Sequence, residues 1–186
     1  MEYFGYRLFR YFRTLFLRVA MVLALCGLSS QSIGQILQVD RLKANYLVGF
    51  IDFARWESDS ASNSTTIAVL SDQDLYRELR RIARDQLSSR KLEIIHLKPG
   101  TQPPVERIDI LFVEKGQDDH WEKIKGHCME AGILLVGEVN RFMEDGGAIQ
   151  FVYRENRLRF IVNQDNANRQ GIVLSSKLVE LSVDKR

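Results

Sequence analysis

The side chains that could do chemistry are few in this chain of 186 residues, and they are spread out. His120 and His127 lie seven positions apart, close to Asp118, Asp119 and Cys128. Two helical turns separate the two imidazoles, so a metal ion bound to one would need its other ligands from elsewhere in the fold. Solvated helix residues are the simpler interpretation, and the sequence predicts no metal site.

Motifs for catalysis are also absent from the sequence. It contains no Gly-x-Ser-x-Gly elbow, no Walker loop, no Gly-x-Gly-x-x-Gly after a predicted strand and no cysteine pairs for zinc. Glu138, Glu144 and Asp145 have no neighbours that suggest paired acid–base chemistry. The sequence therefore predicts a protein that is not an enzyme, with no catalytic residues and no cofactor.

Polar residues follow three of the predicted strands and would share one rim of a parallel sheet. They are Ser71, Asp72, Glu114, Gly137 and Glu138. The rim beyond the carboxyl ends of parallel strands is the usual ligand crevice of such folds. The fold class alone leaves open a small-molecule site there as an alternative.

The elements that would position these residues alternate between strands and helices. Near-continuous apolar runs predict buried parallel strands, and amphipathic stretches predict helices between them. The strands are predicted at 66–70, 92–97, 108–113 and 133–136, and the helices at 38–57, 73–88 and 118–131. This order predicts an α/β fold of three layers, α/β/α, with a mixed, mostly parallel sheet.

A β-hairpin is predicted to close the sheet with antiparallel strands. Apolar residues alternate over 149–153 and again over 157–163, with Asn156 as the turn residue. A polar helical turn over 164–170 should end at Gly171. The last segment, 172–181, is predicted to form a short helix.

The positive charge of the chain is concentrated at its N-terminus. The formal net charge is +2, but four arginines against one glutamate give residues 1–34 a charge of +3 and leave −1 for the rest. The remaining domain has no electrostatic footprint for nucleic acid. An apolar run over 19–28 follows the arginines, and Ser32 and Gly34 suit a cleavage site before Gln35.

We therefore predict a signal peptide over 1–34 and an exported domain over 35–186; a retained membrane anchor is the alternative. After cleavage Cys128 would be the sole cysteine, which excludes an intramolecular disulfide. It is predicted to be a small buried hydrophobe, with an intermolecular bridge as the minority interpretation.

The order of the motifs resembles the YfiR family between Leu42 and Leu181. The opening helix carries Tyr-Leu-x-x-Phe-x-x-Phe-x-x-Trp at 46–56, although Glu57 stands where the family often has proline. The C-terminal half carries Gly-Gly-x-Ile-x-Phe at 146–151, Arg-Phe-x-x-Asn at 159–163 and Leu-Ser-Ser-Lys-Leu at 174–178. Some family members are thought to use disulfides, which this sequence lacks.

The resemblance implies a periplasmic regulatory protein that restrains an inner-membrane signalling protein, with a diguanylate cyclase as the expected partner. A periplasmic small-molecule-binding sensor is the alternative function, and a homodimer is left open. Large side chains near the ends of elements are the candidate partner contacts: Phe53, Trp56, Tyr153 and Arg157.

Overall fold

The structure, a computed structural model, describes residues 30–57, 64–85 and 91–184. The larger of its two compact units begins at Val39. In the described part of the chain, no helix is both long and apolar enough to cross a membrane. The arginines and the apolar run of the predicted signal peptide lie in residues 1–29, outside the described residues, whereas the predicted cleavage point before Gln35 falls within helix α2 (Ser30–Phe50).

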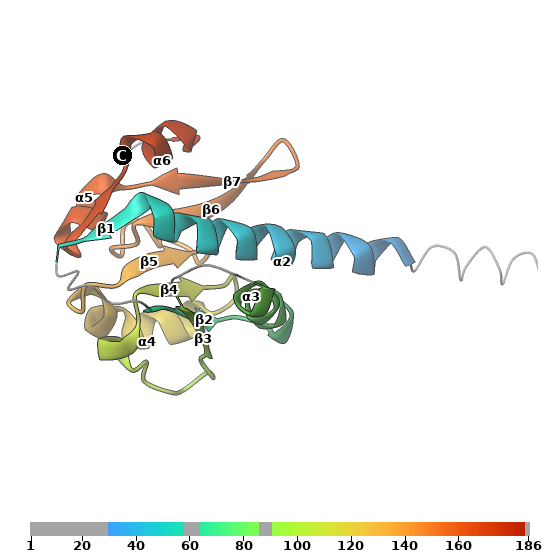
Figure 1. The fold of residues 1–186 in the computed structure, drawn as a ribbon, viewed down its shortest axis with the longest axis horizontal. Coiled ribbons are helices and arrows are strands. Elements are labelled where there is room, and N and C mark those ends of the chain that lie inside the picture. Colours follow the sequence, from blue (N-terminus) through green and yellow to red (C-terminus); the bar gives the residue numbers. More distant parts are fainter. Residues whose placement is uncertain (1–29, 58–63, 86–90, 185–186) are drawn as a thin grey trace, which may run out of the picture. The chain divides into compact units, whose positions relative to one another are not determined.

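Six strands form the main sheet, in the order β3-β2-β4-β5-β6-β7 (Figure 1). Strands β2 to β6 pair in parallel and β7 is antiparallel to β6, so the predicted mixed, mostly parallel sheet is confirmed. The strands are β2 Ser64–Leu70, β3 Lys91–His96, β4 Ile110–Val113, β5 Leu134–Gly137, β6 Ile149–Arg154 and β7 Arg157–Val162. Because β2 lies between β3 and β4, the chain changes direction across the sheet at the β2–β4 pair.

Helices cover the sheet on both faces, which confirms the three-layer prediction. Helices α2 (Ser30–Phe50) and α3 (Gln73–Asp85) contribute to one core layer, and α4 (Asp118–Met129) contributes to the other. Alternate residues of the central strands divide between the layers: Ile67 and Val69 face one, Ala68 and Leu70 the other. All four are fully buried, as expected for a strand covered on both sides.

A second, two-stranded sheet corrects two predictions. The helix predicted over 38–57 ends at Phe50, and a 3₁₀ turn η1 (Ile51–Phe53) leads into strand β1 (Ala54–Trp56). The helix predicted over 172–181 begins only at Ser176 (α6, Ser176–Leu181), because strand β8 (Ile172–Leu174) pairs antiparallel with β1. Short apolar runs suit a strand and a helix equally well, and here a partner distant in sequence selects the strand.

The hairpin and the turn after it are confirmed. Glu155 and Asn156 both have positive φ, 50° and 58°, which is the backbone of a two-residue type I′ turn. Helix α5 (Gln164–Arg169) follows, with the Asn163 side chain accepting a hydrogen bond from the Asn166 backbone N–H. Gly171, at φ 69°, lies where the predicted helix end requires a left-handed residue.

The prediction that Cys128 is a buried hydrophobe is also confirmed, since it is fully buried in the core layer of α4. Burial raises the pKa of its thiol to about 11. Because the thiolate is the reactive form, we expect no reaction of Cys128 with a maleimide reagent at pH 8 in the folded chain, and complete reaction in denaturant. Mass spectrometry measures the labelling, and Cys128→Ala assigns it, because Cys26 is the other cysteine. Rapid native labelling of Cys128 would contradict the expectation.

Candidate functional site

A buried ion cluster lies at the carboxyl edge of the sheet. The Lys43 ammonium, from α2, lies 2.8 Å from Glu138 and 3.2 Å from Glu114. These side chains are 8% exposed for Lys43, 8% for Glu138 and 15% for Glu114. The ammonium also lies 5.9 Å from the centre of the Phe112 ring, within the range of a cation–π contact. One cation therefore joins α2 to the ends of β4 and β5.

The cluster occupies the position where this fold class usually binds ligands. Glu114 follows β4 and Asp72 follows β2, the two strands at which the strand order reverses. The second oxygen of Glu114 accepts a hydrogen bond of 2.8 Å from the Asp72 backbone N–H, at the start of α3. Three of the predicted rim residues, Asp72, Glu114 and Glu138, are thus brought together, and Lys43 fills the space between the two glutamates.

Lys43 was not predicted as a site residue, although the sequence contained a signal for it. Asp40, Lys43, Leu47 and Phe50 recur at three- and four-residue steps, so they share one face of a helix. All four are buried in the structure. Charged residues on an otherwise apolar face indicate buried partners, but the partners, Glu114 and Glu138, are far away in the sequence.

The cluster contains more carboxylates than ammonium groups, and the pKa values of Lys43 and Asp40 are both raised. Burial lowers the pKa of Lys43, but its contacts with Glu138 and Glu114 outweigh burial, and the net shift is upward. Burial raises the pKa of Asp40, and repulsion from Glu114, Glu138 and Asp72 adds to this, against the attraction of Lys43. Asp40 is thus the group whose ionised form the cluster opposes.

The hairpin carries two of the predicted partner-binding residues. Tyr153 is 55% exposed and Arg157 is also exposed, on either side of the turn. Burial of part of the Tyr153 ring raises the pKa of its hydroxyl. The positive charge of Lys43 lowers this pKa, and the negative charges of Glu138, Asp40 and Glu114 raise it. The hairpin therefore lies beside the ion cluster, at the same edge of the sheet.

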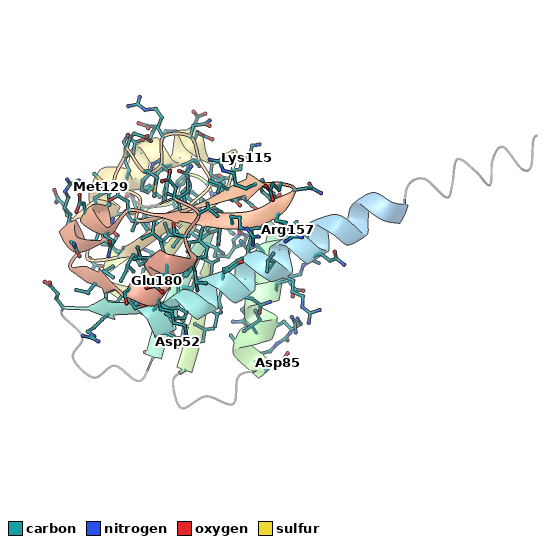
Figure 2. The ribbon with its side chains drawn as sticks, turned by 90° about the horizontal axis from the view of Figure 1, so that it is seen from above. Asp52, Asp85, Lys115, Met129, Arg157 and Glu180 are labelled. Carbon is teal, nitrogen blue, oxygen red and sulfur yellow. The ribbon has the colours of Figure 1, made fainter. Side chains whose placement is uncertain are left out.

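Phe53 and Trp56 belong to a different region. Both are half-buried and pack against the core on which α2 lies, next to the β1–β8 pair. Figure 2 places Arg157 well apart from Asp52, the neighbour of Phe53 in the chain. The structure does not join the four residues in one surface, and their role in partner binding stays a prediction.

An open cavity of about 440 Å³ lies near the opposite edge of the sheet. The C-terminal part of α4, the loop between β5 and β6, and α5 line it with mostly polar side chains, among them Lys125, Asp145 and Asn166. Figure 2 shows Met129, on this cavity, on the far side of the domain from Lys115 and Arg157. The buried Asn166 amide donates to the carbonyls of Met143 and Gly147, so its donors hold the loop in place.

Comparisons with solved structures show the fold. A conserved domain protein from Vibrio cholerae O1 biovar El Tor aligns with a TM-score of 0.51 at 11% identity, over 77% of this chain and 60% of its own length. An ABC domain from Streptococcus pneumoniae, solved with L-Trp, aligns with a TM-score of 0.48 at 9% identity, over 66% of this chain and 55% of its own. At these identities the likeness to the Vibrio protein concerns the fold alone. This chain spans less than two thirds of the length of either structure.

No curated protein matches the sequence. A family model described as YfiR/HmsC-like matches residues 40–183. The match takes in α2 from Asp40, both sheets and α6, and so includes almost the whole compact unit that begins at Val39. The chain belongs to the YfiR/HmsC-like family.

Proposed function

We propose that this chain is a periplasmic regulatory protein, not an enzyme, that binds and restrains an inner-membrane signalling protein of the diguanylate cyclase class. The observation that carries the proposal is the family match over residues 40–183, which includes nearly all of the compact unit. The proposal includes export by a cleaved signal over residues 1–34. In the structure α2 begins at Ser30 and runs through the predicted cleavage point before Gln35.

Restraint of the partner would operate by differential binding. A regulator that binds the inactive conformation of its partner more tightly than the active one shifts the population toward the inactive form. A shift from mostly active to mostly inactive needs a preference of about 10⁴-fold, or about 5.5 kcal/mol. A two-residue turn holds the hairpin in one conformation, so little conformational freedom would be lost when Tyr153 and Arg157 bind.

The hairpin is the part of the predicted contact set that favours this role. Tyrosine and arginine are common among the residues that contribute most to protein interfaces, and here both are exposed at the tip of a rigid element. Phe53 and Trp56 are half-buried against the core, so removing them would disturb packing as well as any contact. Tyr153 and Arg157 therefore give the cleaner test.

We expect the double variant Tyr153→Ala/Arg157→Ala to reduce in-cell crosslinking of the full chain to a membrane cyclase by about tenfold or more, because each side chain contributes about 1 kcal/mol or more at an interface. Quantitative mass spectrometry of the crosslinked membrane fraction measures the loss, with cellular cyclic di-GMP expected to rise. Leu181→Ala, at an exposed apolar residue elsewhere, is the matched control and should leave the yield unchanged. Undiminished crosslinking by the double variant would place the contact elsewhere.

A small-molecule-binding sensor is the second candidate, and the cavity between α4 and α5 is the observation that favours it. Its volume is within the range of pockets for small ligands. The strand-end crevice favours this function less, since the side chain of Lys43 occupies it. A thermal-shift screen of small metabolites separates the candidates: stabilisation by a ligand, together with no membrane protein crosslinked in cells, would favour the sensor.

A further inference from the structure

The hairpin side chains that point away from α2 belong to neither core layer of the described structure, although Ile161, toward the base of the hairpin, is buried. The core layer of α4 includes side chains of β2, β4 and β5 and none of β6 or β7. The strand pairing puts Val152 opposite Arg159 and Arg154 opposite Arg157 on this face, while Tyr153 and Leu158 point to the other. We call Val152, Arg154, Arg157 and Arg159 the outer hairpin face. The two arginines nearest the turn are exposed, and Val152 and Arg159 are half-buried.

Three arginines therefore share this face, and the acid beside them in the sequence is the exposed Glu155 of the turn. Among the described residues, the ion pairs involve other side chains, and none includes Arg154, Arg157 or Arg159. On α3, Arg77 pairs with Asp74, and Arg81 pairs with Glu78 and Asp85, whereas Arg80 and Arg84 belong to none of the ion pairs of the described residues. Like charges directly opposite each other on neighbouring strands destabilise a sheet. The outer hairpin face thus lacks the partners that would offset its charge.

We propose that the outer hairpin face binds an acidic segment of the partner protein, with carboxylates on that segment pairing with the guanidinium groups. This inference rests on the proposed function and adds the chemistry of the partner. The planar guanidinium matches a carboxylate with two parallel hydrogen bonds, and the exposed positions of Arg154 and Arg157 leave those donors accessible. Val152, which lies opposite Arg159, offers a small apolar contact beside the Arg154–Arg157 pair.

Other occupants fit the charges less well. Juxtamembrane clusters that bind anionic lipid contain about four to eight basic residues, whereas this face has three and residues 35–186 carry a net charge of −1. A second copy related by a two-fold axis would bring the same patch against itself, so arginines would face arginines. A protein segment rich in Asp and Glu supplies the missing charge with matching geometry.

The chemistry is tested with the purified full chain and two labelled peptides, one rich in Asp and Glu and a matched one with Asn and Gln. We expect the acidic peptide to bind more tightly, with an affinity that falls as salt is raised. Arg154→Glu/Arg157→Glu should weaken binding by about tenfold or more. The matched control is Arg80→Glu/Arg84→Glu, which makes the same charge change on two exposed arginines of α3 and should leave binding within about twofold.

A single variant separates binding from folding. Arg154→Glu puts a carboxylate opposite Arg157, so we expect its thermal midpoint to rise while peptide binding falls. A merely structural role for Arg154 would move both in the same direction. No preference for the acidic peptide, or equal losses in the α3 control, would overturn the proposal.

Three further outcomes distinguish failure of this surface from failure of the proposed function. Binding to vesicles of phosphatidylethanolamine and phosphatidylglycerol that depends on Arg154 and Arg157, with no peptide preference, would identify a membrane surface instead and overturn the proposal. Crosslinking to a membrane cyclase that the double charge reversal leaves intact would overturn this surface and leave the proposed function standing. Crosslinking to no signalling protein from the wild-type chain, with peptide binding as expected, would count against the proposed function alone.

Discussion

Replacing Lys43 by methionine is expected to lower the free energy of unfolding by about 3–5 kcal/mol, because removing one partner of a buried ion pair leaves the other charges uncompensated. The Lys43 side chain is 8% exposed, and the Glu114 and Glu138 side chains that it joins are 15% and 8% exposed. Methionine keeps an apolar stem of similar length and removes the charge that lies over the Phe112 ring. Urea denaturation followed by circular dichroism measures the loss, and an unchanged midpoint would show that the cluster contributes nothing to stability.

Asp40→Asn is the matched control, one helical turn earlier on the same buried face. It removes a negative charge from a cluster in which carboxylates exceed the ammonium, so we expect this variant to stabilise the fold at neutral pH. Two substitutions of similar burial should thus shift the urea midpoint in opposite directions. Destabilisation by both would indicate that packing, and not charge, dominates at this face.

The pH dependence of stability follows from the same two groups. The pKa of Lys43 in the folded chain lies above its ordinary value of 10.5, so its contribution is fully present below pH 10.5 and is lost as pH rises through the folded pKa. The pKa of Asp40 lies above its ordinary value of 3.8, so the folded chain binds that proton more tightly than the unfolded chain. The contribution of Asp40 therefore falls as pH rises from 3.8 through the folded value, and Asp40→Asn should remove that slope.

Replacing Phe142 by alanine is expected to cost about 3–5 kcal/mol, the usual range for a fully buried aromatic side chain. The ring lies 4.9 Å from that of Trp121, centre to centre, in the core layer of α4. Two glycines leave room for the ring. A Cβ at Gly137 would come within 2.7 Å of the ring, and a Cβ at Gly147 would clash with it. Thermal denaturation of the variant measures the cost, and a loss below about 1 kcal/mol would contradict this packing.

Gly147→Ala tests the same contact from the other side. We expect it to destabilise the fold by about 1–3 kcal/mol through overpacking against Phe142. The double variant Phe142→Ala/Gly147→Ala removes the clash with the ring but keeps the close approach of the methyl to the Phe142 carbonyl oxygen, 2.7 Å, so the loss should be smaller than the sum of the two single losses. Gly126→Ala is the control, because a Cβ there meets no atom within 4 Å and alanine favours the helix. Strict additivity would mean that the two residues are not coupled.

The sequence determined most of the main sheet, because its signals are local. A continuous apolar run such as Ile67–Leu70 suits a strand covered on both faces, and it forms the C-terminal half of β2. Asn156 between two alternating runs predicted the hairpin, since a type I′ turn needs residues that tolerate positive φ. The order of these elements then limited the fold to an α/β sheet, and the chain belongs to the family that the motifs resembled.

The tertiary structure decided the pairings between residues that are far apart in the sequence. Ile172–Leu174 became a strand only because Ala54–Trp56 lies beside it, and the choice between strand and helix for three residues depends on that neighbour. Lys43 became part of the candidate site only because α2 lies against the ends of β4 and β5. Its ammonium is buried there and pairs with Glu114 and Glu138. The periodicity of apolar residues predicts which face of a helix is buried. The residues that this face contacts are distant in the sequence, so a local pattern does not predict them.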